Sequence, residues 1–154
     1  MEERSLTEIS REANRHNPFV QLLGVEIEEV GPDYSRLRLE IRPESLNPHA
    51  LVHGGALFTL ADNAAGSAVS TDGRAYVTQA GDIHFLRVQA EGSVAAEARV
   101  LHRGRSTALV EVKLIGGEDR LMATASFSFF CVDGSAIDRN SPIRAGRALE
   151  KDRA

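Results

Sequence analysis

The sequence of 154 residues contains a single cysteine, so no disulfide can form within the chain. A lone cysteine gives no sign of an oxidising compartment. Cys131 follows the apolar pair Phe129-Phe130, a position typical of a packed small residue and not of a nucleophilic thiol. Stability must therefore come from a hydrophobic core, for which one domain of this length is sufficient.

Long apolar runs and an excess of positive charge are also lacking. No stretch approaches the ~20 apolar residues that span a bilayer, and the start, "MEERSLTEIS", lacks the apolar core of a signal peptide. The formal net charge of −4 argues against general nucleic-acid binding. We therefore expect a cytoplasmic protein with no membrane or nucleic-acid partner. No His/Cys cluster has metal-ligand spacing, so we expect neither a metal nor another cofactor.

The repeat of apolar residues along the sequence predicts the helices and strands. Alternation of apolar and polar residues predicts strands, and a repeat near 3.6 predicts helices. The expected order is a helical segment at 5–23, strands at 25–30 and 35–42, a loop at 43–53, a helix at 54–70, and strands at 75–87, 93–103, 106–115 and 121–132.

An antiparallel sheet with one uninterrupted helix must cover the apolar stripe of that helix. The prediction is an α+β fold in which a curved antiparallel sheet wraps around a central long helix. It has an N-terminal helical segment (1–23), a main domain (24–132) and a polar C-terminal tail (133–154).

The long helix has two distinct faces. Its apolar stripe, which we expect to pack on the sheet, consists of Leu57, Leu60, Ala61, Ala64 and Ala68. At 100° per residue, a second face gathers Gly55, Thr59, Asp62 and Gly66. That face is small apart from one carboxylate, which suits close approach by a ligand or another chain. The alternative is that Asp62 is an ordinary exposed polar residue.

Two glycines, Gly54 and Gly55, stand where this helix begins. The first amides of a helix have no partners within it and carry about half a positive charge. Because glycine has no Cβ, a ligand can approach these amides closely. They are candidates for an oxyanion hole that binds a carbonyl oxygen as it becomes negative. The alternative is that they only let the loop turn into the helix.

The spacing of these candidates has a consequence for assembly. Asp62 lies seven residues beyond Gly55, which is roughly 10 Å along a helix. One carbonyl group cannot contact both. If both act on one substrate they must come from two chains, with antiparallel helices related by a two-fold axis. A catalytic interpretation therefore predicts a dimer.

Three segments also resemble a known family. "NPHALVHGGALFTLAD" (47–62), "AYVTQAGDIHFLRV" (75–88) and "VLHRGRSTALVEVKL" (100–114) resemble the hotdog-fold acyl-CoA thioesterases of the phenylacetyl-CoA type, over about residues 15 to 132. The resemblance implies a hotdog fold, a dimer or dimer of dimers, and hydrolysis of acyl-CoA to free acid and CoA, as in phenylacetate degradation. Val88 stands where this family usually has proline, so the end of that strand is expected to differ.

The resemblance also implies roles for individual residues. The Gly55 amide would polarise the thioester carbonyl, and His53 and Asn47 would order the loop and the water or carbonyl. Asp62 would be the catalytic carboxylate, contributed across the dimer interface, as general base or as nucleophile. Thr78 lies near a Ser/Thr that positions the attacking water in related enzymes.

Substrate-binding residues can be proposed from residue type. The hairpin "HRGRS" offers cations and amides for the CoA phosphates through Arg103, Gly104, Arg105 and Ser106. Arg87 is a further candidate, and the alternative for the hairpin is a turn with solvated arginines. Gly54 and Phe58, with Leu51 and Val52, are expected to line the acyl site, which would accept either arylacyl or medium-chain groups.

Two rival functions stay open. A hotdog enoyl-CoA hydratase needs an Asp and a His about five residues apart, and Asp62 has no such partner. A non-catalytic acyl-CoA-binding regulator would carry a DNA-binding segment, for which residues 1–23 are too short and too acidic.

Overall fold

One curved antiparallel sheet and one long helix form the body of the protein. The computed structural model describes residues 4–132, so the predicted tail at 133–154 lies outside the described residues. The elements in chain order are α1 (Leu6–Arg15), α2 (Pro18–Leu23), β1 (Val25–Gly31), β2 (Tyr34–Glu40), η1 (Pro43–Ser45), α3 (Gly54–Val69), η2 (Ser70–Asp72), β3 (Ala75–Phe85), β4 (Ser93–Arg103), β5 (Thr107–Ile115), η3 (Gly117–Asp119) and β6 (Leu121–Val132).

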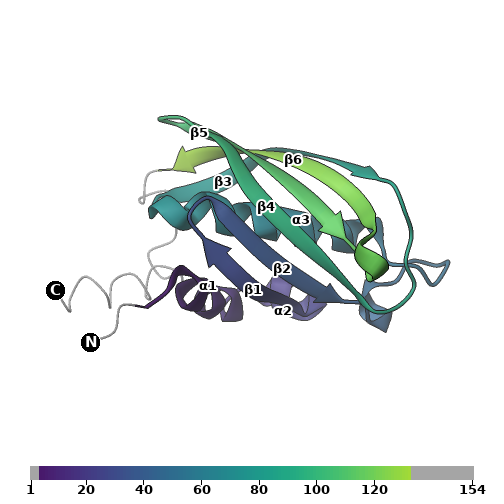
Figure 1. Ribbon diagram of the computed structural model, residues 1–154. Coiled ribbons are helices and arrows are strands. Elements are labelled where there is room, and N and C mark those ends of the chain that lie inside the picture. The colour runs from purple at the N-terminus through teal and green to yellow at the C-terminus, as the bar shows by residue number, and fades with distance from the viewer. Residues whose placement is uncertain (1–3, 133–154) are drawn as a thin grey trace.

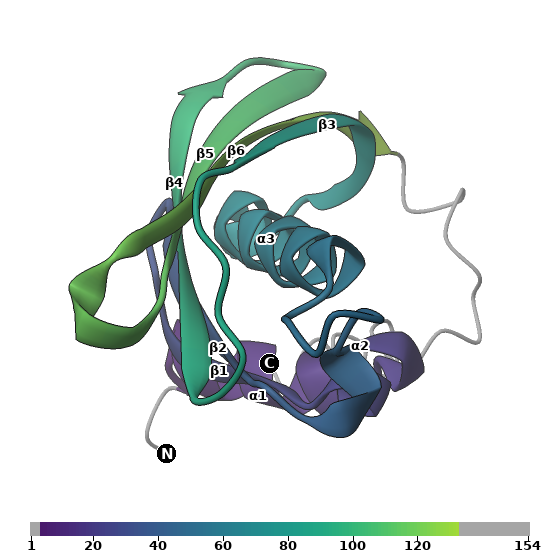
Figure 2. The same cartoon turned by 90° about the vertical axis from the view of Figure 1, so that its right-hand side faces the viewer.

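The strands lie in the order β1-β2-β4-β5-β6-β3, and every neighbouring pair is antiparallel. The sheet runs along α3 (Figure 1) and bends around it when seen nearly end-on (Figure 2). The predicted α+β architecture, a curved sheet around a central helix, is confirmed. This arrangement leaves one flank of α3 beside the edge strand β3.

The core lies between α3 and the concave face of the sheet. All five residues of the predicted apolar stripe are buried, together with Ala56, Ala65 and Val69. Alternate residues of β5 point at the helix and are buried, whereas those between them are exposed. The inward side chains are mostly small or branched, and each fully buried Leu or Phe contributes about 1.5–3 kcal/mol. The largest fully buried side chain, that of Phe127, is contributed by β6.

The N-terminal segment differs from the prediction of one helix over 5–23. Ser5 caps α1 and forms a capping box with Glu8, as its residue type allows. A second helix then begins at Pro18, because Asn17 caps it and proline favours the first helical position. Side chains of α1 donate to backbone carbonyls of β1, including Arg11 to Ile27 and Glu28. The β1 edge of the sheet is therefore covered by α1.

The opposite edge, β3, is open. The strand ends at Phe85, two residues earlier than predicted, because the amides of Leu86 and Arg87 both donate to the Met122 carbonyl. Most residues of β3 are exposed on both faces. β6 is its one strand partner within residues 4–132. A long edge strand of this kind can pair with another chain.

Candidate functional site

The start of α3 is held by the residue that precedes it. His53 has an extended backbone (φ −69°, ψ 135°) and is the N-cap of the helix. Its carbonyl accepts hydrogen bonds from the amides of Ala56 (2.9 Å) and Leu57 (3.2 Å). Its ring Nδ1 accepts a hydrogen bond of 2.8 Å from the Gly55 amide. The helix tip is therefore capped by a side chain from its own chain.

This cap bears on the prediction for Gly55. The Gly55 amide, predicted to bind the substrate carbonyl, already donates to His53 in this structure. Among the hydrogen bonds of residues 4–132, none engages the Gly54 amide. Gly54 is the first residue of α3, where an amide has no partner within the helix. The amide available for a carbonyl oxygen is therefore that of Gly54.

The loop before the helix is ordered by Asn47. Its Oδ1 accepts hydrogen bonds from the amides of His49 (2.9 Å) and Leu51 (3.2 Å). The backbone amide of Asn47 donates to the Leu51 carbonyl at 2.8 Å. A bridge between Leu46 and Val52 closes the loop. Asn47 thus fixes the approach to His53 from within the loop.

Asp62 lies in the middle of α3, on the face turned toward β3. The hydroxyl of Thr78, on β3, donates to its Oδ1 at 2.7 Å. None of the ion pairs among residues 4–132 involves Asp62. Burial raises the pKa of Asp62 above its ordinary value, and the Thr78 hydrogen bond opposes part of that rise. A carboxylate in this setting is a better proton acceptor than an exposed one.

Around Asp62, the helix face is small and partly open, as predicted. Gly55 is exposed, and Thr59 and Gly66 are partly buried. The Thr59 hydroxyl donates back to the Gly55 carbonyl at 2.9 Å. Asp62 lies eight residues beyond Gly54, or roughly 12 Å along the axis. The free amide and the carboxylate of one chain therefore cannot reach the same carbonyl group.

Aromatic side chains from α3 and β3 lie beside the helix face that carries Asp62. Phe58, predicted to line the acyl site, packs edge-on against Phe127 with ring centroids 5.3 Å apart. Phe85 was not predicted: its ring comes within 3.1 Å of where a Cβ on Gly54 would stand, yet it remains 51% exposed. Strand alternation toward the end of β3 was the only signal for it. Leu51 is partly buried and Val52 is buried.

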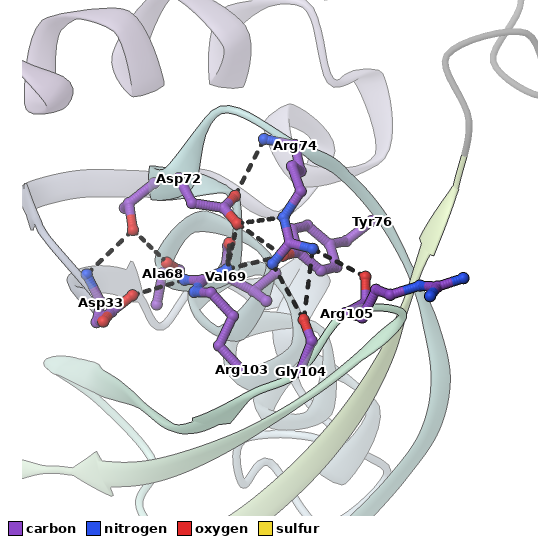
Figure 3. A network of polar contacts seen from close by, with 10 residues as sticks. Asp33, Ala68, Val69, Asp72, Arg74, Tyr76, Arg103, Gly104 and Arg105 are labelled. Atoms are coloured by element: carbon purple, nitrogen blue, oxygen red, sulfur yellow. Dashed lines mark hydrogen bonds and ion pairs between the residues drawn. The ribbon is translucent and has the colours of Figure 1, made fainter.

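The hairpin residue Arg103, predicted to contact the CoA phosphates, makes several contacts within the chain (Figure 3). Its guanidinium donates to Asp33 Oδ1 (2.6 Å), the Val69 carbonyl (2.7 Å) and the Tyr76 hydroxyl (2.8 Å). It also pairs with Asp72 at 3.0 Å. Arg103 therefore joins the β1–β2 turn to the C-terminal end of α3, and both terminal nitrogens of its guanidinium have partners within the chain.

The rest of the hairpin is also partly committed. The Gly104 amide, predicted to be accessible, donates to the Thr107 carbonyl at 2.8 Å. The Ser106 carbonyl accepts from the Cys131 amide at 2.7 Å, while the residue itself is exposed. The Arg105 side chain points away from the cluster (Figure 3).

The predicted phosphate ligands are thus split between two ends of α3. The hairpin contacts Val69, at the end of the helix. Arg87 follows Phe85, which contacts the beginning of the helix. Arg87 is exposed, and its side chain donates one hydrogen bond, to the Leu121 carbonyl at 2.7 Å. Of the predicted cations, Arg87 is therefore the one that lies two residues from a side chain in contact with Gly54.

Two further observations bear on chemical class. Within residues 4–132, no group of three or more His, Cys, Asp or Glu side chains is placed to hold a metal ion. In the same part of the chain, no helix has the length and apolar character needed to cross a membrane.

Comparison with known proteins identifies the family. Residues 49–123 match the thioesterase superfamily model. The chain is 31% identical to the acyl-coenzyme A thioesterase PaaI of Escherichia coli K12, over 66% of this chain and 73% of the relative.

Solved structures agree as well. The E. coli PaaI protein from the phenylacetic acid degradation operon superposes with a TM-score of 0.77 at 27% identity, covering 84% of this chain and 98% of that chain. A variant of the phenylacetic acid degradation protein PaaI from Thermus thermophilus gives 0.72 at 29% identity, covering 75% and 100%. The chain belongs to the thioesterase superfamily and is a thioester hydrolase with the hotdog fold.

Proposed function

We propose that the protein hydrolyses acyl-CoA thioesters to a free acid and CoA, with Asp62 and the Gly54 amide as its catalytic groups. The observation that carries this proposal is a partly buried carboxylate without a counter-ion, held by one hydroxyl, on a helix whose first amide is free. Burying an uncompensated charge is costly, so a chain that retains one gains something other than stability from it.

The chemistry follows from these two groups. The thioester carbonyl oxygen accepts a hydrogen bond from the Gly54 amide. The position of this amide at the helix start stabilises the negative charge that develops on the oxygen. Asp62 takes a proton from a water molecule, which attacks the carbonyl carbon. The C–S bond then breaks, and the thiolate leaves. The raised pKa of Asp62 favours this general-base role, while direct attack by the carboxylate is the alternative.

The separation between the two groups implies a dimer. Two copies that pair antiparallel along β3 extend the sheet and bring their α3 helices side by side. The small face around Gly55, Thr59 and Gly66 permits that approach. Gly54 of one chain then faces Asp62 of the partner, and the two-fold axis creates two sites. Both surfaces are available, because β3 is an open edge and the helix face beside it is partly exposed.

The substrate fits the residues around Gly54. Arg87 is our candidate for contact with the CoA phosphates, because it is exposed and a guanidinium binds phosphate through paired hydrogen bonds. Phe58 and Phe85 supply apolar surface for the acyl group. The PaaI relatives are named for phenylacetic acid degradation, so phenylacetyl-CoA is the first acyl-CoA to test, ahead of medium-chain substrates. CoA is part of the substrate, and the reaction needs no other cofactor.

The test is a thiol-release assay over a panel that includes phenylacetyl-CoA, hexanoyl-CoA and acetyl-CoA. We expect turnover of at least one arylacyl or medium-chain substrate. Loss of the crotonyl-CoA double bond by UV absorbance, with no thiol release, would instead establish a hydratase. Saturable binding of the panel without release of thiol would establish a binding protein. Either of these results contradicts the proposal.

A further inference from the structure

Gln89 lies between the end of β3 and the beginning of β4, in a segment with no regular structure. Its backbone carbonyl accepts a hydrogen bond of 2.8 Å from the Val52 amide. Its side-chain Oε1 accepts the Gly117 amide at 2.9 Å. Its Nε2 donates to the carbonyls of Glu91 (2.8 Å) and Ser93 (3.1 Å). One residue therefore connects three separate segments of the chain.

Both the nitrogen and the oxygen of the side-chain amide have hydrogen-bond partners. A primary amide has two N–H donors and one carbonyl acceptor, and all of them have backbone partners here. Two carbonyls lie on the nitrogen side and one amide lies on the oxygen side, which fixes the orientation of the group. Gly116 leaves room for it, because a Cβ at that position would overlap Oε1. Gln89 is thus held more firmly than its partly exposed position suggests.

The backbone contact leads directly to the helix tip. Val52, which Gln89 holds, precedes His53, the N-cap of α3. Phe85, four residues before Gln89, lies against Gly54. The segment 85–89 therefore contacts the first residue of α3 through an aromatic ring and the loop just before the helix through a hydrogen bond. A shift of this segment would move the Gly54 amide with it.

We propose that Gln89 is a positioning residue that sets the placement of the Gly54 amide by bracing the 85–89 segment against the turn at 116–117. The proposal rests on the proposed function for its kinetic consequence. Misplacement of a catalytic group by about 1 Å can reduce a rate up to a hundredfold. Removing the brace should therefore slow the chemical step, and it should also weaken substrate binding through Phe85 and Arg87 on the same segment.

The test uses Gln89→Met, which keeps the length of the side chain and removes its hydrogen bonds. The matched control is Glu91→Gln, an exposed residue of the same loop. The probes are phenylacetyl-CoA and hexanoyl-CoA, assayed by thiol release with the full-length protein. We expect kcat to fall about tenfold in Gln89→Met, with a rise in KM as well, because Phe85 and Arg87 lie on the released segment. Glu91→Gln should match the wild type.

A second measurement does not depend on activity. Hydrogen exchange of the Val52 and Gly55 amides should be faster in Gln89→Met than in the wild type, with Glu91→Gln unchanged. Gln89→Glu, which keeps the acceptor for Gly117 and loses both donors, should change exchange in the same direction and serves if the methionine variant folds poorly.

Unchanged kcat per folded molecule, with a lower melting temperature alone, would show a structural role and overturn the inference. Unchanged exchange at Val52 and Gly55 would also overturn it. If the wild type hydrolyses neither probe, the proposed function fails for these substrates, and exchange alone decides the role of Gln89.

Discussion

Two carboxylates, one in the middle of the site-bearing helix and one just beyond its C-terminal end, have opposite surroundings. Asp72, beyond the end of α3, accepts hydrogen bonds from the Arg74 side chain (2.6 Å) and the Tyr76 hydroxyl (2.8 Å), and pairs with Arg103 (Figure 3). Asp62, in the middle of the helix, has one neutral hydroxyl as its partner. Polar groups are abundant around the first and scarce around the second.

The pKa values move in opposite directions for this reason. Burial acts to raise the pKa of Asp72, but hydrogen bonds from Arg74 and Tyr76 and the charge of Arg103 outweigh it, and the pKa falls below its ordinary value. For Asp62, burial outweighs the single hydrogen bond, and the pKa rises. A neutralised carboxylate stabilises the fold, whereas an uncompensated one is available for chemistry.

The largest expected effect comes from Asp62→Asn, which keeps the shape and removes the base. We expect kcat to fall at least about a hundredfold, within the range for loss of a general base. Thiol release under saturating substrate measures it. Unchanged turnover would remove Asp62 from the mechanism.

The same variant should be more stable than the wild type at neutral pH. A raised folded-state pKa means that the folded protein binds the Asp62 proton more tightly than the unfolded chain does. Stability is therefore lost as pH rises from the unfolded pKa through the folded pKa. The amide side chain of the variant avoids that loss, so its melting temperature should exceed that of the wild type at pH 7. The gain should disappear below about pH 3.9, at equal protein concentration.

The next effect concerns the helix tip. Gly54→Pro removes the amide hydrogen at the first helical position, where proline is well tolerated, and the extended backbone of His53 suits a residue before proline. Gly54→Ala keeps the amide and controls for the added carbon beside Phe85. We expect the proline variant to lose about a hundredfold or more in kcat relative to the alanine variant.

A parallel pair at Gly55 distinguishes the two glycines. Because the Gly55 amide already donates to His53, Gly55→Pro should lose less activity relative to Gly55→Ala than the corresponding pair at Gly54. The reverse order would restore Gly55 as the donor.

A smaller effect is expected at Thr78. Thr78→Val keeps the shape of the side chain and removes the one hydrogen bond that lowers the pKa of Asp62. The acid limb of the pH profile of kcat/KM should therefore move to higher pH, while Thr78→Ser should resemble the wild type. A limb that stays in place in Thr78→Val would separate this hydroxyl from the titration of the base.

Asp72→Asn should have the smallest effect on activity. Loss of this partially exposed network should lower the free energy of unfolding by about 1–2 kcal/mol, with kcat per folded molecule retained. A lowered folded-state pKa stabilises the protein above the unfolded pKa, and that stabilisation is lost as pH falls through the folded pKa. The difference between wild type and variant, measured by thermal melts, should therefore shrink in acid. A large loss of kcat would contradict a structural role.

Sequence patterns predicted much of the fold because the apolar periods are strong. The stripe from Leu57 to Ala68 and the alternation in β5 each have one arrangement that buries them. The break between α1 and α2 was missed, although Asn17-Pro18 is a recognisable start of a helix.

The site was less predictable for a physical reason. The Arg103 contacts with Asp33 and Tyr76 join residues far apart in the chain, and a local hairpin pattern carries no information about them. The capping of Gly55 by His53 depends on a side-chain rotamer that no spacing specifies. Asp62 could be singled out because a carboxylate among alanines and glycines is unusual in any helix.

The central claim, that each site takes its amide from one chain and its base from the other, is tested most directly by mixing two inactive variants. Asp62→Asn and Gly54→Pro subunits, unfolded and refolded together in equal amounts, should form mixed dimers that contain one intact site. The account predicts recovery of about a quarter of wild-type activity in the mixture. Activity no higher than the mean of the two parent variants, with mixed dimers confirmed by mass spectrometry, would contradict it.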